Sequence, residues 1–393
     1  MQYRIDERTG QKLSILGFGC MRLPRGARGI DIQKTERLIL RAIEAGVNYF
    51  DTAYLYGGSE LALGTILSRN NLRDKVYIAT KLPIANCHTY ADFDRFFDTQ
   101  LSALDTDYVD YYLMHNINSL AQWNELCTYG LREWISEKKA AGKCRQIGFS
   151  FHGAKDEFTK VLDAYDWDFC QIQYNYANEH YQAGVNGLKL AAARRLPVII
   201  MEPLLGGKLA NGLSRAAVET FRKVNADYSP AAWGFRWLWN QPDVTVVLSG
   251  MNEIAQLEDN LAIADKSEPN MLTGDEKAAY EKVIELFKAT DKVPCTGCSY
   301  CMPCPQGVNI PACFASYNAS YTHGRVTSLV MYITSTAANR EGKSLASSCV
   351  GCGKCERHCP QKIEIRRELA AVKRRMEPFW FGITMKIMRK RTK

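Results

Sequence analysis

The cysteines are the residues in this sequence whose spacing points most directly to chemistry, and nine of the 14 lie between residues 295 and 359. The later of two runs has two residues between its first three cysteines, three residues before the fourth, and a proline directly after it. Its members are Cys349, Cys352, Cys355 and Cys359. Four thiolates hold a [4Fe-4S] cluster, and this spacing binds such clusters, so the run predicts iron–sulfur chemistry. Zinc is the alternative. A zinc site, however, needs only four thiolates, fewer than the two runs supply together, and it typically pairs two CxxC units.

An earlier run has only two residues before its last cysteine, where the later run has three. Its members are Cys295, Cys298, Cys301 and Cys304. Together the runs resemble a two-cluster ferredoxin, in which the fourth cysteine of each run binds the cluster of the other run. The resemblance implies that Cys359 completes the first cluster and Cys304 the second. Cys313 lies in a segment with helical character, where it is either a buried structural residue or the ligand in place of Cys304.

Some 44 residues separate the two runs, which leaves room for two helices around residues 309–318 and 328–338. The cysteine region is therefore predicted to be a small, mainly α-helical, ferredoxin-like domain. The other five cysteines are scattered through residues 20–170 without regular spacing, and we interpret them as packing residues.

The first 265 residues alternate eight times between a short run rich in β-branched or aromatic residues and a segment with helical periodicity. This alternation predicts an α/β fold, a (β/α)8 TIM barrel with a parallel inner sheet. The chain of 393 residues exceeds a barrel of roughly 250 residues, and the surplus accommodates the cysteine region. We expect a barrel in residues 1–272, a linking helix in 273–290, a 4Fe-4S ferredoxin-type domain in 291–365 and a basic tail in 366–393.

Polar residues end several of the predicted strands, at the side of the barrel where functional residues gather. They are Asp51, Lys81, His115, Ser150, Asn175 and Glu202. Each one alone is as well explained as a cap or a solvated loop residue. Several together favour a catalytic site at this end of the barrel.

Seven segments of residues 1–265 resemble the motifs of aldo-keto reductases. They are DTAYLYGGSE, ATKLP, YLMH, GFSFHG, QIQYNY, EPLLGGKL and SGMNEIAQLEDNL. With the cysteine region added, the chain resembles the iron–sulfur branch of that superfamily over all but its basic tail. The resemblance implies an NAD(P)H-dependent oxidoreductase that reduces a small-molecule carbonyl, in an aldehyde, ketone or quinone. It places a catalytic tetrad on Asp51, Tyr56, Lys81 and His115.

The residue types of this tetrad suit carbonyl reduction. Hydride from nicotinamide arriving at carbon puts negative charge on oxygen, so a proton donor is needed beside that oxygen, and Tyr56 is the implied donor. Tyrosine, with an ordinary pKa of about 10, is a weak acid, and a nearby Lys81 ammonium favours its ionised form. Asp51 is implied to position the lysine, and His115 to orient and polarise the carbonyl.

The resemblance also places the nucleotide. The implied contacts are Ser150, Gln171, Met201, Pro203, Leu205, Gly207, Ser249, Gly250, Met251, Gln256, Asp259 and Asn260. Ser150 and Gln171 would hold the carboxamide, and Met201 replaces an aromatic residue that stacks on the nicotinamide in many relatives. Residues 205–208 match the loop that crosses the pyrophosphate. Gln256 stands where an arginine would grip a 2′-phosphate, so both NADP(H) and NAD(H) stay open.

Hydride transfer to a carbonyl moves two electrons in one step and needs no iron, so the clusters require a role of their own. Three roles are open: the clusters relay single electrons from a ferredoxin-like carrier, stabilise the fold, or sense redox state. A pair of clusters favours the relay. A competing interpretation is an electron-transfer or redox-sensing protein whose barrel binds nucleotide without turnover. The presence of all four tetrad residue types argues against it.

The charge of the chain is concentrated at one end. Residues 366–393 hold ten Lys or Arg and two Glu, which accounts for the formal net charge of +8. Because the rest of the chain is neutral overall, we expect no nucleic-acid partner. The tail either contacts an anionic membrane surface or forms a solvated terminal helix. The polar first ten residues and the lack of a long apolar run predict a cytoplasmic protein.

Overall fold

The computed structural model describes residues 1–393 apart from 28, 323, 338–343, 380 and 382–393. The chain forms two compact units. The first comprises Met1–Pro203 and Ala231–Leu272, and the second comprises Leu204–Pro230 and Thr273–Lys393. The chain therefore crosses between the units three times.

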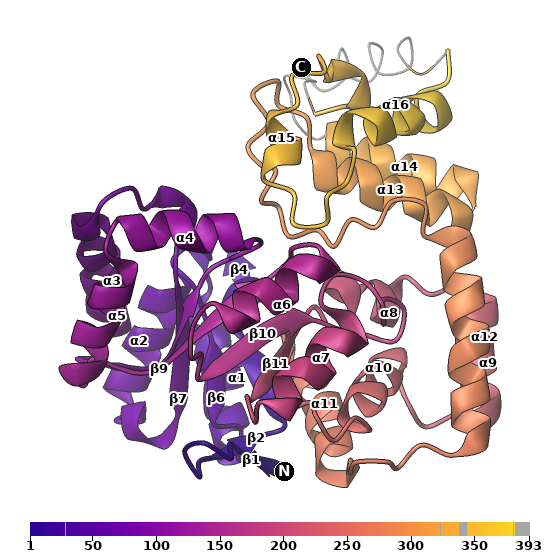
Figure 1. The fold of residues 1–393 in the computed structure, drawn as a ribbon. Coiled ribbons are helices and arrows are strands. Elements are labelled where there is room, and N and C mark those ends of the chain that lie inside the picture. Colours follow the sequence, from indigo (N-terminus) through magenta and orange to yellow (C-terminus); the bar gives the residue numbers. More distant parts are fainter. Residues whose placement is uncertain (28, 323, 338–343, 380, 382–393) are drawn as a thin grey trace. The chain divides into compact units, whose positions relative to one another are not determined.

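The first unit is a closed barrel of eight parallel strands (Figure 1). The strands are β3 (Leu16–Gly19), β6 (Tyr49–Asp51), β7 (Tyr77–Leu82), β8 (Val109–Met114), β9 (Cys144–Phe151), β10 (Phe169–Gln173), β11 (Val198–Met201) and β12 (Val246–Ser249). Each strand pairs with the next along the chain, and β12 closes the barrel against β3. This topology confirms the predicted (β/α)8 barrel.

Helices connect the strands around the outside of the barrel (Figure 1). They are α1 (Ile32–Glu44), α2 (Ser59–Arg69), α3 (Tyr90–Leu104), α4 (Leu120–Thr128), α5 (Leu131–Ala140), α6 (Lys155–Asp163), α7 (Gly184–Ala193), α10 (Pro230–Trp239) and α11 (Ile254–Lys266). Two short hairpins pair β1 (Tyr3–Ile5) with β2 (Lys12–Ser14) and β4 (Arg25–Gly26) with β5 (Gly29–Ile30).

Large side chains from several strands form a buried core cluster with Tyr49, Tyr111 and Phe169 among its members. Gly17 lies against this packing, because a Cβ on it would stand 2.7 Å from Val246 Cγ1. A side chain there would displace the valine. The GFGC segment at the start of the barrel thus has a packing reason for its first glycine.

The second unit is mainly helical. Its helices are α8 (Lys208–Asn211), α9 (Arg215–Val224), α12 (Gly274–Thr290), α13 (Ile310–Thr322), α14 (Arg325–Ala337), α15 (Lys354–Arg357) and α16 (Ile365–Met376). The expected linking helix corresponds to α12, which begins with a capping box between Thr273 and Glu276. Helices α9 and α12 contact each other, and the rings of Phe221 and Tyr280 lie 5.4 Å apart. This contact brings the segment Leu204–Pro230 into the second unit.

Helix α16 covers much of the sequence that we described as the start of the basic tail. Its apolar residues Leu369, Val372 and Met376 are buried in the core of the second unit, together with Phe314 of α13. The basic residues of this helix therefore belong to a helix that is packed against the core of the second unit. The end of the tail, residues 382–393, lies outside the described residues. Within the described part of the chain, no helix has the length and hydropathy needed to cross a membrane.

Candidate active site and cysteine centres

Three neighbouring strands and one loop carry the predicted tetrad. Asp51 is the last residue of β6, Lys81 lies near the end of β7, and His115 directly follows β8. Tyr56 lies in the loop between β6 and α2, and its backbone N–H donates to Ala53 O at 3.0 Å. Because parallel neighbouring strands end on the same side of a barrel, three strand ends and the loop that follows the first of them meet at one place.

Lys81 is buried and paired with a carboxylate. Its Nζ donates to Asp51 Oδ1 at 2.6 Å and to Thr52 O at 2.7 Å. The side chains of Lys81 and Asp51 are 1% and 5% exposed. A buried ammonium is tolerated only when it is paired and hydrogen-bonded. The position of this charge is therefore set by the protein.

Tyr56 lies beside this ammonium and is half-buried. Lys81 Nζ stands 4.8 Å from the centroid of the Tyr56 ring. The ring is also 6.0 Å from the imidazole of His115, at an interplanar angle of 86°. The structure thus brings all four tetrad side chains together, with the phenol the most accessible of them.

His115 is held as a neutral imidazole. Burial lowers its pKa well below the ordinary 6.5, and the nearby charges of Lys81 and His152 lower it further. An imidazole in this state offers one N–H donor and one acceptor. It can hydrogen-bond a carbonyl oxygen without itself being an acid that competes with Tyr56.

A buried polar network behind Lys81 was missed by sequence reasoning. Thr80 Oγ1 and Gln100 Nε2 donate to Glu60 Oε1 at 2.5 and 2.6 Å. Gln100 Nε2 also donates to the backbone oxygen of Lys81 at 3.1 Å, and Tyr112 Oη donates to Gln100 Oε1 at 2.7 Å. Burial raises the pKa of Glu60, and the hydrogen bonds from Thr80 and Gln100 oppose that rise. The network fixes the backbone of β7 that carries the lysine.

Two of the predicted carboxamide contacts lie at the tetrad. Gln171 in β10 donates its Nε2 to Asp51 Oδ2 at 2.9 Å. The hydroxyl of Ser150 in β9 accepts the backbone N–H of Asn116 at 2.9 Å. Asn116 directly follows His115 and has a φ of 63°. Gln171 thus donates a hydrogen bond to the second oxygen of the carboxylate that positions Lys81. Sequence reasoning did not foresee this contact.

The predicted nucleotide contacts between Ser249 and Asn260, which the resemblance places at the adenosine end, lie where β12 leads into α11. Asn260 Nδ2 donates to Ser249 Oγ at 2.9 Å, and Gln256 Oε1 accepts the backbone N–H of Asn252 at 2.9 Å. Met251 is buried, Asp259 is half-buried and Gly250 is exposed. The side chain of Gln256 therefore accepts a hydrogen bond from the backbone just before its own helix, α11.

The predicted pyrophosphate loop is divided between the units. Met201 and Pro203 belong to the first unit, whereas Leu205 and Gly207 belong to the second. Leu205 and Gly207 have positive φ values of 48° and 96°, which make a tight turn before α8. Within the second unit, the ammonium of Lys208 forms an ion pair with Asp291 and donates to Val293 O at 3.2 Å.

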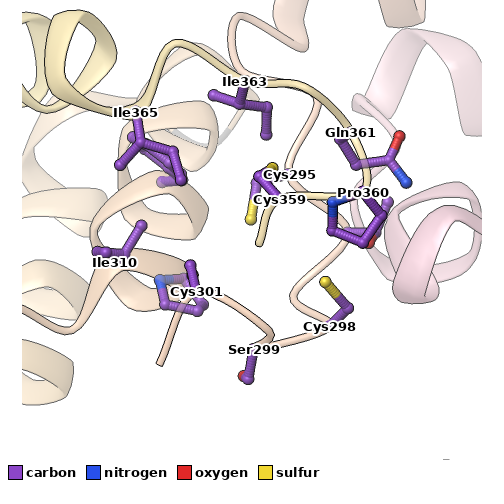
Figure 2. A pocket seen from close by; sticks show the side chains of 13 residues that line it. Cys295, Cys298, Ser299, Cys301, Ile310, Cys359, Pro360, Gln361, Ile363 and Ile365 are labelled. Carbon is purple, nitrogen blue, oxygen red and sulfur yellow. The ribbon is translucent and has the colours of Figure 1, made fainter. Parts of the chain in front are cut away.

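One group of cysteines lines a cavity in the second unit. The four are Cys295, Cys298, Cys301 and Cys359, and apolar side chains of Ile310, Phe314, Ile363 and Ile365 complete the wall (Figure 2). Burial, with a smaller contribution from neighbouring thiols of the group, raises the pKa of Cys295 to about 11 and that of Cys301 to about 12. Without metal these thiols are protonated, and metal binding must release their protons. Four thiols around one cavity fit the donor set of a [4Fe-4S] cluster.

A second group contains the other four cysteines of the two runs. Burial raises the pKa of Cys355, and among the lesser causes are the nearby thiols of Cys349 and Cys304. Cys352 is exposed, whereas the other three are half-buried. Cys313 is fully buried, and its thiol donates to Ser344 O at 3.7 Å. Among the described residues, no three His, Cys, Asp or Glu side chains are close enough together to hold a single metal ion.

Known proteins share both parts of this architecture. The model of the aldo/keto reductase family matches residues 15–276, and that of a 4Fe-4S dicluster domain matches residues 294–364. The chain belongs to the aldo-keto reductase family. The uncharacterized oxidoreductase YrpG of Bacillus subtilis is 24% identical over 310 residues, which cover 68% of this chain and 92% of that protein. L-galactose dehydrogenase of Arabidopsis thaliana is 26% identical over 311 residues, which cover 71% of this chain and 93% of that protein.

A solved aldo-keto reductase from Klebsiella pneumoniae, in complex with NADPH, shares the fold of this one. It aligns with a TM-score of 0.60 and 22% identity, over 72% of this chain and 96% of that one. The present aldo-keto reductase is thus an oxidoreductase with a C-terminal 4Fe-4S dicluster domain. Its cofactors are a nicotinamide nucleotide and two [4Fe-4S] clusters.

Proposed function

We propose that this aldo-keto reductase uses NAD(P)H to reduce the carbonyl group of a small aldehyde, ketone or quinone. The observation that carries the proposal is the tetrad, in which a buried ammonium lies 4.8 Å from the ring centroid of an accessible tyrosine. A phenol beside a fixed positive charge is a proton donor whose ionised form is stabilised. Carbonyl reduction needs such a donor at the oxygen.

Each tetrad residue has one task in this reaction. The nicotinamide, when bound, supplies the hydride. Tyr56 gives its phenolic proton to the carbonyl oxygen, where negative charge develops, and Lys81 stabilises the phenolate that remains. Asp51 holds the ammonium at 2.6 Å, and Gln171 holds Asp51 in turn. The neutral His115 hydrogen-bonds the carbonyl oxygen and orients it.

The nucleotide preference within this proposal is weak. Gln256 replaces the arginine that would pair with a 2′-phosphate, and its side chain is already engaged with Asn252. A 2′-phosphate gains most from a guanidinium, which binds phosphate in a bidentate manner. We therefore expect NADPH and NADH to differ by less than about tenfold in kcat/KM, measured with one carbonyl substrate.

The clusters relay single electrons in this proposal, and the ligands divide as in two-cluster ferredoxins. Cys295, Cys298, Cys301 and Cys359 hold one cluster, which their common cavity supports. Cys304, Cys349, Cys352 and Cys355 hold the other. The proximity of Cys304 to Cys355 supports this choice, as does the engagement of Cys313 with Ser344.

The substitution Tyr56→Phe tests the catalytic proposal. It removes the proton donor, so NAD(P)H oxidation with a panel of aldehydes and quinones should fall by about 10²- to 10³-fold in kcat. Nucleotide affinity, measured by fluorescence titration, should change little because the phenol acts on the substrate.

The matched control is Tyr54→Phe. Tyr54 lies two residues earlier in the same loop and is 38% exposed. It should retain the activity of the unaltered chain. Equal rates for the two variants, or no nucleotide oxidation by the unaltered iron-loaded protein with any substrate, would contradict the proposal.

A further inference from the structure

The two cysteine groups of the second unit differ in their access to solvent. In the group around the cavity, Cys359 is 8% exposed and the other three are half-buried. In the other group, Cys352 is exposed, and Val350, which directly follows Cys349, is 65% exposed. An electron passes between two proteins only when their redox centres come close together. The group that contains Cys352 is therefore the one that a second protein can approach.

The two regions also differ in charge. Residues 349–376 hold eight Lys or Arg and three Glu, whereas residues 293–314 hold no charged residue. Three of the four cysteines of the more exposed group, Cys349, Cys352 and Cys355, thus lie in a basic segment, whereas three of the four in the cavity group lie in an uncharged one. A basic surface attracts acidic partners and raises the rate at which they associate.

The carboxylates of this basic segment are already paired within it. Glu356 forms an ion pair with Arg366 at 2.9 Å, and Glu364 pairs with Arg367. Glu368 lies 3.8 Å from the same Arg367. These contacts neutralise two of the arginines and leave other cations available.

Among the described residues, five exposed cations of the segment have no carboxylate within ion-pair distance. Two of them, Lys373 and Arg374, stand on α16. The other three, Lys354, Arg357 and Lys362, lie close in sequence to the cysteines, and we name them the basic rim. Lys354 and Arg357 stand on α15, on either side of Cys355 in the sequence. Lys362 follows Cys359 by three residues. The positive charges of the basic rim are thus close in sequence to cysteines of both groups.

We propose that the basic rim, together with Val350 and Cys352, is the docking surface for an acidic one-electron carrier protein. The inference rests on the proposed relay and adds which cluster receives the electron and from what kind of partner. In each encounter the reduced carrier loses one electron and the centre held by Cys304, Cys349, Cys352 and Cys355 gains it. Two encounters with two carrier molecules provide one electron for each of the two clusters.

A small contact of this kind suits a carrier that must leave after delivery. Redox encounters bury little surface and depend on charge for their rate. Val350 supplies an exposed apolar side chain for the contact, and the basic rim supplies the electrostatic attraction. Such binding should weaken steeply with added salt.

The test measures binding of the iron-loaded chain to an acidic plant-type [2Fe-2S] ferredoxin, by calorimetry at several salt concentrations. The rim variant carries Lys354→Glu, Arg357→Glu and Lys362→Glu. The matched control carries Lys277→Glu, Lys282→Glu and Lys288→Glu on α12, three charge reversals on exposed lysines of the same unit. Iron content and visible absorbance must be the same in all three proteins.

We expect the rim variant to bind the ferredoxin at least about tenfold more weakly and with a smaller salt dependence, while the α12 control binds within about twofold of the unaltered chain. Equal affinity for the rim variant and the unaltered chain would overturn the proposal. So would a lack of ferredoxin binding by the unaltered chain combined with rim-dependent binding to anionic phospholipid vesicles, since the rim would then serve a membrane.

The same experiment separates this inference from the catalytic proposal. Tyr56→Phe should lower carbonyl reduction by about 10²- to 10³-fold in kcat and leave ferredoxin binding unchanged. Rim-dependent ferredoxin binding by a chain that reduces no carbonyl would refute the catalytic proposal alone. Carbonyl reduction by a chain that binds no ferredoxin would refute the docking surface alone.

Discussion

The tetrad and the cysteine centres reach their working geometry by different means. In the barrel, the charged and polar groups form ion pairs and hydrogen bonds with one another, as Lys81 Nζ does with Asp51 Oδ1 and Thr52 O. In the cysteine cavity, much of the wall is apolar and the thiols of Cys295 and Cys301 are protonated in the absence of metal. The barrel site is therefore organised by the chain itself. The cysteine centres need their clusters to complete them.

Removing iron should have the largest effect, and it should affect the cysteine centres but not the barrel. Because cluster binding is part of the folding free energy of such a domain, oxidative removal with ferricyanide and a chelator should loosen residues 293–363 and leave the barrel intact. Thermolysin should then cleave within residues 293–363 about tenfold faster, as followed by mass spectrometry. Identical cleavage patterns with and without iron would show that the apolar core of the second unit is sufficient without clusters.

Removing one partner of the buried ion pair should have the next largest effect. Lys81→Met leaves the Asp51 carboxylate buried without its cation, so the free energy of unfolding in urea should fall by about 3–5 kcal/mol. Carbonyl reduction should be lost as well, because the phenolate of Tyr56 is no longer stabilised.

The double variant Asp51→Leu with Lys81→Met separates stability from catalysis. Removing both charges eliminates the uncompensated carboxylate, so most of the lost stability should return. Activity should stay absent. If the double variant is no more stable than Lys81→Met, the loss of stability does not come from an uncompensated Asp51 carboxylate, and the ion pair does not have the role described above.

The smallest expected effect concerns pH. Because burial lowers the pKa of His115 in the folded protein below the unfolded value of 6.5, the unfolded chain binds more protons in the interval between the two values. The free energy of unfolding should therefore fall as pH drops below about 6.5, by at most about 1.4 kcal/mol per pH unit for this one group.

The comparison variant for this measurement is His115→Asn. Its unfolding free energy should depend less on pH between 5 and 7 than that of the unaltered chain. Glu60 acts in the opposite direction, because its raised pKa favours the folded state as pH falls. The difference between the two proteins removes that common contribution. Parallel pH dependences would contradict a neutral buried His115.

The barrel and its strand ends could be predicted because their signals are local. Each strand is a short run of apolar residues, and a parallel barrel brings the ends of successive strands together. The convergence of Asp51, Lys81 and His115 follows from those two facts. Cysteine spacing is equally local, and it pointed to the region that the dicluster family matches.

Other contacts could not be foreseen because they depend on which distant residues meet. Gln171 was assigned to the nicotinamide, and nothing in its neighbourhood indicates that its amide reaches Asp51, 120 residues away. Glu60 and Gln100 stand on helices among apolar residues, where a buried polar side chain resembles a solvated one. The affiliation of Leu204–Pro230 with the second unit depends on the packing of α9 against α12.

That affiliation has a consequence for any attempt to separate the two activities genetically. A gene shortened after codon 272 would still encode α9 but not the helix against which Phe221 packs. The truncated product would carry an uncovered apolar surface and a tendency to self-associate. Swapping the cysteine region between homologous enzymes would require transferring residues 204–230 as well.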